Sequence, residues 1–258
     1  MNARALFELL AQTTWLTLDN AHRREIAFGE DAVTSVNLLA LAGLTGRAVV
    51  VEDTRADEHH TGCDFELWIR AHRWQWMGYA VQAKKVSART GRYEKLGHTV
   101  NGQRQIDILS GYARKREITP VYCFFSGMRP VTRWNCQLPQ ADDQLGCMVT
   151  PMRVVENALK IRGARSFSWM HRQPESVPWR CLVTCMSSHL SEIGDAEAIG
   201  GHPVPAAPTE RLPDELAVMW ERRRFGLIRE SVAPGVPWEG VQYYPRSIAI
   251  LDAVEAHE

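Results

Sequence analysis

Long hydrophobic runs are absent from this sequence. None of its 258 residues falls in an apolar stretch of about 18 or more, the length at which a transmembrane helix is expected. The N-terminal segment carries Glu8 within a short apolar stretch and no small-residue cleavage site, so it does not resemble a secretory signal peptide. We therefore expect a cytoplasmic protein that does not enter a membrane.

An excess of charge of either sign is also absent, because 30 basic residues balance 30 acidic ones. A zero net charge argues against a protein that coats nucleic acid through bulk charge, so any nucleic-acid site must be a local cluster of Lys and Arg. The chain is 45% apolar and 23% charged, which provides enough apolar material for a sizeable core and argues against wholesale disorder.

Paired Cys-x-x-Cys or Cys/His motifs, which are typical of zinc sites, are lacking too. Only Cys181 and Cys185 are closely spaced, and their surroundings alternate like a buried strand. Free thiols, mostly buried in strands, are the simplest interpretation in a cytosolic chain, and a structural zinc site is the minor alternative. The six cysteines are Cys63, Cys123, Cys136, Cys147, Cys181 and Cys185.

Hydrophobic periodicity predicts an α/β fold with a central mixed sheet flanked by helices. The core has the element order α-β-β-β-α-β over residues 1–130, and residues 131–258 form a C-terminal α+β extension packed on it, in one continuous domain. The core elements are a helix at 23–44, strands at 47–52, 63–69 and 79–86, a helix at 103–116 and a strand at 119–126. The extension contains strands at 146–151 and 178–185, helices at 152–161, 213–228 and 248–254, and a loop rich in Gly, Ala and Pro at 194–213.

Candidate chemistry lies on the two strands expected to form a hairpin. Alternation places Asp64 on one face of the first strand, and Gln82 and Lys84 on one face of the second. Hydrolysis of a phosphodiester commonly uses Mg²⁺, which prefers hard oxygen ligands. Asp64, the Gln82 side-chain oxygen and the Ala83 carbonyl supply such ligands, and Glu30 on the preceding helix adds a second carboxylate.

The sequence leaves the roles of Lys84 and Glu66 open. Lys84 would orient or deprotonate the attacking water, or neutralise charge in the transition state. Glu66 shares a face with Asp64 and would be a metal ligand or supporting residue, or simply a solvated strand residue. An Asp followed by Gln-x-Lys is also frequent by chance, and a solvated salt-bridge face would explain the same charges.

The segments Thr61-Gly-Cys-Asp-Phe-Glu and Tyr79-Ala-Val-Gln-Ala-Lys-Lys resemble the catalytic core of Mrr-like restriction endonucleases. This branch of the PD-(D/E)xK superfamily typically has Gly-x-Asp and then a strand ending in Gln-Ala-Lys. The match covers residues 23–126, and it extends to uncharacterised bacterial proteins of the phage-defence type. The resemblance implies a restriction-endonuclease-like fold, a Mg²⁺ (or Mn²⁺) cofactor, and a catalytic set of Asp64, Gln82 and Lys84 with Glu30 as a helix-borne carboxylate.

The chain departs from the superfamily pattern at two positions. Cys63 replaces the common Pro before the Asp, and Gln82 replaces an acidic ligand, which lowers metal affinity unless Glu30 or Glu66 compensates. The leading hypothesis is therefore a metal-dependent endonuclease that hydrolyses DNA phosphodiester bonds in anti-phage defence or restriction. The alternative is a catalytically decayed module of the same fold that binds nucleic acid or supports assembly.

A local basic cluster follows the second strand, where phosphate-positioning residues would be useful. DNA is the expected partner, with RNA not excluded. A homodimer would supply the two active sites commonly used to cut both strands, and a defence-system partner protein is a further expectation. The cluster consists of Lys85, Arg89, Arg92 and Lys95.

Overall fold

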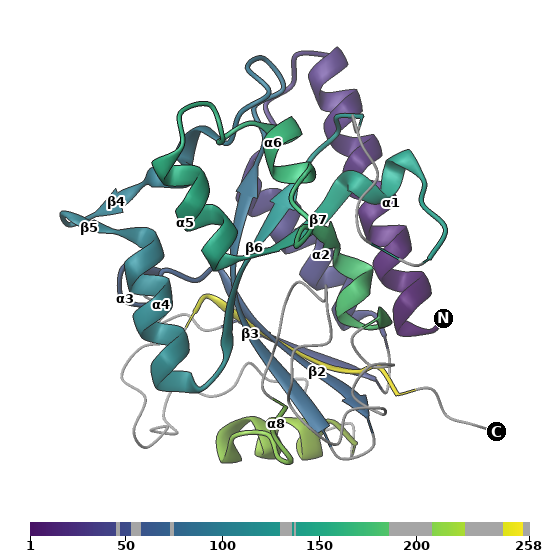
Figure 1. Ribbon diagram of the computed structural model, residues 1–258. Coiled ribbons are helices and arrows are strands. Elements are labelled where there is room, and N and C mark those ends of the chain that lie inside the picture. The colour runs from purple at the N-terminus through teal and green to yellow at the C-terminus, as the bar shows by residue number, and fades with distance from the viewer. Residues whose placement is uncertain are drawn as a thin grey trace.

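The computed structural model describes residues 1–44, 47–52, 58–72, 75–129, 136, 138–185, 208–224 and 245–254. Within these ranges the chain forms a seven-stranded mixed sheet with helices on both faces (Figure 1). None of the described helices is both long and apolar enough to span a membrane.

The sheet combines parallel and antiparallel pairs. Strand β9 is parallel to β2 and strand β3 is parallel to β6, whereas all other neighbours in the sheet are antiparallel. A separate hairpin joins β4 (Thr99–Val100) to β5 (Gln103–Arg104). In spatial order the strands are β1 (Ala48–Glu52), β9 (Ser247–Asp252), β2 (Phe65–His72), β3 (Gln75–Lys85), β6 (Thr119–Phe125), β7 (Cys147–Pro151) and β8 (Val177–Pro178).

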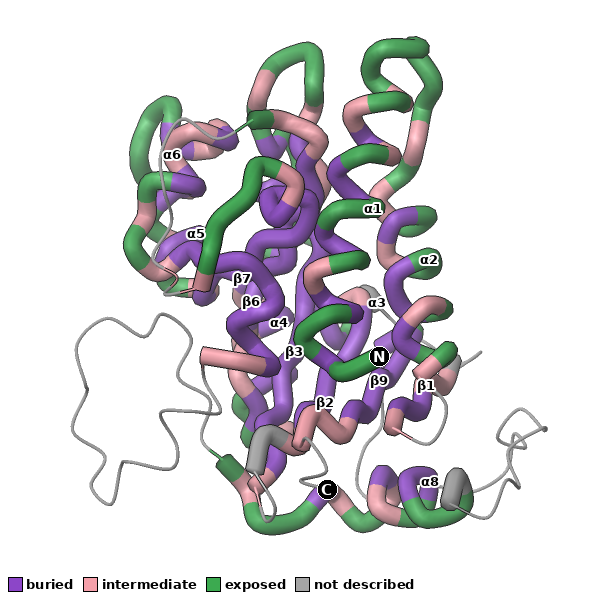
Figure 2. The backbone as a smooth tube through the Cα atoms, turned by 90° about the vertical axis from the view of Figure 1, so that its right-hand side faces the viewer, coloured by how far each residue is buried: buried purple, intermediate pink, exposed green. Residues whose placement is uncertain are grey.

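Two hydrophobic clusters cover the opposite faces of the sheet, because strand side chains alternate between faces. Helices α1 (Ala3–Arg23) and α2 (Glu30–Ala42) contribute to one cluster. The other receives α4 (Gln105–Arg116), α5 (Met152–Lys160), α6 (Phe167–His171) and α8 (Asp214–Arg224). Figure 2 shows the buried central strands behind α1 and α2, whose outer turns are exposed. The short helices are α3 (Glu58–Thr61), η1 (Glu94–Gly97), η2 (Asp142–Gly146) and η3 (Trp179–Leu182).

The order α2-β1-β2-β3-α4-β6 follows the predicted order of core elements, with short extra elements between them. The β2–β3 hairpin pairs Phe65 with Val81 at one end and His72 with Gln75 at the other. Its faces alternate as expected: Phe65 and Val81 pack toward α1 and α2, and Trp68 packs on the opposite face.

Two sequence predictions for the remaining elements were wrong, and one helix was missed. The helix expected at 248–254 is instead β9, because a short apolar run does not distinguish a helix from a strand buried on both faces. The strand expected at 178–185 is reduced to the two residues of β8, followed by the 3₁₀ helix η3. Helix α1, which precedes the helix predicted at 23–44, was not predicted at all, and the loop expected at 194–213 lies largely outside the described residues.

Strand β9 lies between β1 and β2, so the sheet takes strands from both sides of the expected boundary at residue 130. The C-terminal segment thereby completes the sheet on which the candidate site is built.

Candidate functional site

The candidate site lies where β3 runs on beyond the start of its partner β2. The pairing of the two strands begins at Phe65 and Val81, but β3 continues to Lys85 along β6. The Asp64 N–H donates to the Val81 carbonyl over 2.9 Å, so the backbone groups of Val81, Ala83 and Lys85 point to the β2 side. Ala83 and Lys85 therefore present backbone groups at an edge that β2 does not cover.

Two carboxylates bind this open edge. Asp64 Oδ2 accepts a hydrogen bond from the Ala83 N–H over 2.6 Å, and Glu30 Oε2 accepts one from the Lys85 N–H, also over 2.6 Å. Glu30 is the first residue of α2, where the helix dipole favours a negative charge. The two amides are two residues apart, about 7 Å along a strand. Two carboxylates and the Ala83 carbonyl thus share one short edge.

The side-chain amide of Gln82 lies between two of these oxygens. Its Nε2 donates to Asp64 Oδ2 and, over 3.2 Å, to the Ala83 carbonyl. The residue is fully buried, and its Oε1 has no hydrogen-bond partner among the described residues. The Gln82 amide nitrogen thus lies where the Asp64 carboxylate oxygen and the Ala83 carbonyl oxygen converge. Beside it, the buried Gln82 Oε1 is an unsatisfied acceptor among the described residues.

This arrangement fits a hard divalent cation. A cation bound by Asp64 and the Ala83 carbonyl would replace the partly positive amide NH₂ group as the partner of these two oxygens, with the Gln82 side chain drawn back to make room. A half-turn of the Gln82 amide, whose oxygen and nitrogen have nearly the same shape, would present the unsatisfied Oε1 to the same point. Oxygen-only ligands of this kind suit Mg²⁺ or Mn²⁺.

Lys84 brings a positive charge to the same site. Its side chain is only 6% exposed, and Nζ lies 3.5 Å from Glu30 Oε1. Gln82 and Lys84 share one strand face by alternation, so the ammonium group and the amide project beside each other while Glu30 reaches across the end of the strand.

Glu66 lies in a different environment from Asp64. Its fully buried carboxylate accepts hydrogen bonds from Trp68 Nε1 over 2.8 Å, from the Tyr112 hydroxyl, and from Arg116 Nε and Nη2 over 2.9 and 3.1 Å. Burial raises the pKa of Tyr112 and the Glu66 carboxylate raises it further, so the hydroxyl stays a donor. Arg116 also contacts Glu215 over 2.8 Å. These partners tie β2 to α4 and α8 and do not bring Glu66 into the Asp64 cluster.

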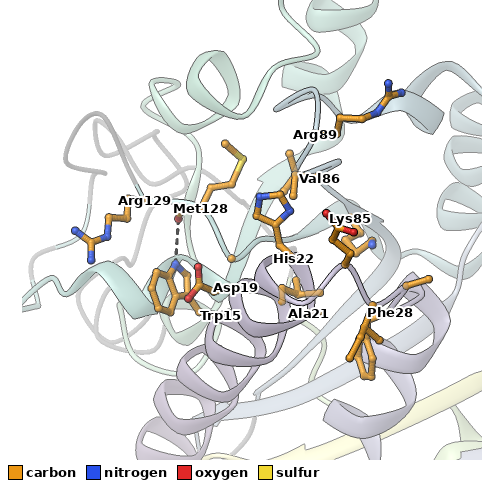
Figure 3. A pocket seen from close by; sticks show the side chains of 16 residues that line it. Trp15, Asp19, Ala21, His22, Phe28, Lys85, Val86, Arg89, Met128 and Arg129 are labelled. Atoms are coloured by element: carbon orange, nitrogen blue, oxygen red, sulfur yellow. Dashed lines mark hydrogen bonds between the residues drawn. The ribbon is translucent and has the colours of Figure 1, made fainter.

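A cleft of about 770 Å³ opens beside the site. Lys85, which follows the candidate catalytic lysine, is one of its lining residues, and Arg89 is another. Figure 3 shows the His22 imidazole in the middle of the cleft and the Arg89 guanidinium pointing outward at its rim. Arg92 and Lys95 are exposed and lie outside the lining. The basic residues that line the cleft are His22, Lys85, Arg89 and Arg129, and the acidic ones are Asp19 and Glu25.

The residues contributed by α1 were missed by the sequence interpretation. Leu6, Leu10, Trp15 and Leu18 recur at spacings of three to five residues and are buried, a pattern that indicates an amphipathic helix. That signal predicts the helix, but it does not predict that His22 in its last turn lies in the cleft with Lys85.

The fold and this site define an α/β protein with an oxygen-rich candidate metal centre at a sheet edge, next to a cleft whose lining includes both basic and acidic residues. The chain belongs to a family of unknown function, DUF6615, whose model matches residues 3–237. No curated protein matches the chain.

Proposed function

We propose that this protein is a metal-dependent nuclease of the PD-(D/E)xK superfamily, related to the Mrr-like restriction endonucleases. The observation that carries the proposal is the convergence of Asp64 and the Ala83 carbonyl on one point, with the unsatisfied Gln82 oxygen beside it. Glu30 and Lys84 complete a set of two carboxylates and one ammonium group.

The arrangement of the central elements supports the same proposal. Helix α2, the β2–β3 hairpin, helix α4 and a strand β6 parallel to β3 follow the α-β-β-β-α-β order of the superfamily. Strand β9, which separates β1 from β2, is an addition to that core.

In the proposed reaction a bound Mg²⁺ or Mn²⁺ would polarise the scissile phosphate and lower the pKa of a water ligand. Asp64, the Ala83 carbonyl and the turned Gln82 amide would hold it, and Glu30 would add a ligand directly or through water. Lys84 would hold the attacking water by hydrogen bonding or stabilise the charge that develops on the phosphate. Its contact with Glu30 fixes where the ammonium group lies.

The cleft suggests how a phosphate backbone would reach this site. Lys85 and Arg89 lie in its wall, and Arg92 and Lys95 continue the positive charge along the exposed segment after β3. Phosphate contacts of this kind position a duplex without reading its sequence. We propose DNA as the substrate, with RNA as the alternative, and a cytoplasmic role in defence with a homodimer or a partner protein.

The second candidate is a decayed nuclease fold that only binds nucleic acid. The neutral amide of Gln82 favours it, because the site then has one negative charge fewer than an acidic residue would give. The two candidates differ in whether the purified protein binds Mg²⁺ and cleaves.

Nicking of supercoiled plasmid DNA tests the proposal. The wild-type protein is expected to nick DNA only with Mg²⁺ or Mn²⁺, and Asp64→Ala to lose more than about 100-fold of the rate. This substitution should leave the fold intact, because Asp64 is partly exposed at a sheet edge. Asp107→Ala is the matched control, since this carboxylate is paired with Arg104 on the surface of α4. Equal nicking by Asp64→Ala would exclude this site, and metal-independent DNA binding without cleavage would favour the second candidate.

A further inference from the structure

Three cysteine sulfurs from two distant segments meet next to α1. Cys181 lies in η3, Cys185 follows four residues later, and Cys136 precedes Cys181 by 45 residues. The Sγ atoms of Cys136 and Cys181 are 3.5 Å apart, and those of Cys181 and Cys185 are 3.6 Å apart. All three sulfurs lie within 4.8 Å of one another.

These separations suit a common metal ligand sphere better than a disulfide. A disulfide needs sulfurs about 2.05 Å apart. Zinc–thiolate bonds of about 2.3 Å at tetrahedral angles place the sulfurs about 3.8 Å apart, close to the observed 3.5 and 3.6 Å. Three cysteines also exceed what one disulfide can use.

The surroundings compensate the charge that thiolates would bring. The side chain of Arg180 is 3% exposed, and its Nη2 lies 3.6 Å from Cys136 Sγ. The same guanidinium donates to the Pro139 carbonyl over 2.6 Å and to Glu8 Oε1 over 2.9 Å. Three thiolates and one Zn²⁺ carry a net charge of −1, which this buried cation faces.

We propose that Cys136, Cys181 and Cys185 form a zinc site that holds Cys136 against η3, next to the contact of Arg180 with the Pro139 carbonyl. Three sulfur ligands select Zn²⁺ over Mg²⁺, and a fourth position remains for water or another protein donor. We assign the zinc site a structural role because it lies far from the cleft. Glu8, which binds Arg180, and His22 of the cleft are 14 residues apart on α1, or about 21 Å along the helix. The zinc site is therefore independent of the proposed nuclease centre.

The experiment uses the full chain, purified under reducing conditions without chelators. Elemental analysis is expected to give about one zinc per chain after incubation with equimolar Zn²⁺ and desalting. Replacement by Co²⁺ should give the strong visible bands of a tetrahedral site and a thiolate-to-cobalt charge-transfer band. This readout needs no variant, so a failure of a variant to fold does not affect it.

Cys181→Ser should weaken zinc binding by more than about 100-fold, since loss of outer-shell partners alone costs 10- to 100-fold. Cys123→Ala, which removes a buried thiol of β6 outside the cluster, should bind zinc like the wild type. No zinc uptake by the reduced wild type, an octahedral cobalt spectrum, or full zinc binding by a Cys136→Ser/Cys181→Ser variant would overturn the proposal. So would a native mass that is about 2 Da low because of a Cys136–Cys181 disulfide.

Discussion

Replacing Glu66 by Gln separates a structural carboxylate from a metal ligand. Gln has nearly the same shape, but it removes the charge that pairs with Arg116 and turns one acceptor into a donor. Glu66 is fully buried and the Arg116 side chain is only 7% exposed, so solvent screens their attraction little. Among the residues that the structure describes, the substitution therefore leaves the buried guanidinium with Glu215 as its one carboxylate partner, next to the Trp68 and Tyr112 donors.

Removing one partner of a buried ion pair typically costs about 3–5 kcal/mol. In a chain of this size each kcal/mol shifts Tm by roughly 2–4 °C. We therefore expect Glu66→Gln to lower Tm by about 6–20 °C while the folded protein keeps its affinity for Mn²⁺. The matched control is Asp107→Asn, which breaks the exposed pair with Arg104 and should cost less than about 1 kcal/mol.

Thermal unfolding followed by tryptophan fluorescence measures Tm, and titration with Mn²⁺ at a temperature well below the Tm of the variant measures the affinity of the folded protein. A Glu66→Gln protein that is as stable as the control but no longer binds Mn²⁺ would show instead that Glu66 is a metal ligand.

Three further predictions concern other parts of the molecule. Burial lowers the pKa of His171 to about 3; the unfolded state, with a pKa near 6.5, therefore binds the proton first as pH falls. Stability contributed by His171 should drop by about 2 kcal/mol between pH 7 and pH 5, and urea unfolding of His171→Phe should lack this part of the pH dependence. Gly146→Ala should destabilise by more than about 3 kcal/mol in the same assay, because its Cβ would overlap a carbonyl oxygen of α1, whereas Gly111→Ala meets open space and should not destabilise. In plasmid nicking, Lys84→Ala should lose roughly 100-fold or more of the rate and Gln82→Glu should keep it, with tighter metal binding; the opposite pattern would reverse the roles assigned on β3.

The hairpin could be predicted from the sequence because its signal is local. Residues 63–69 and 79–86 alternate between apolar and polar side chains, and this period survives in β2 and β3 with Gln82 and Lys84 on one face. The helix and strand that follow, α4 and β6, could also be predicted in the right order, because each has a clear apolar pattern.

The remaining features depend on contacts between distant residues. Strand β9 is inserted between β1 and β2, almost 200 residues after β1, and its apolar run has no period that identifies a strand. Strand alternation places Glu66 on the same face as Asp64. It does not predict that the Glu66 carboxylate binds Arg116, which lies 50 residues away in the sequence. The approach of Cys136 to Cys181 has no local sequence signal either.

Anomalous diffraction from a crystal of the full chain soaked in Mn²⁺ is the most direct test of the proposed metal centre. We expect a single strong peak at the open edge of β3, about 2.2 Å from Asp64 and from the Ala83 carbonyl, with the Gln82 amide turned so that its oxygen faces the ion. The same soak of Asp64→Ala crystals should show no peak there. An edge without Mn²⁺ in the wild type, with the Gln82 nitrogen still bound to Asp64, would contradict the proposed metal centre.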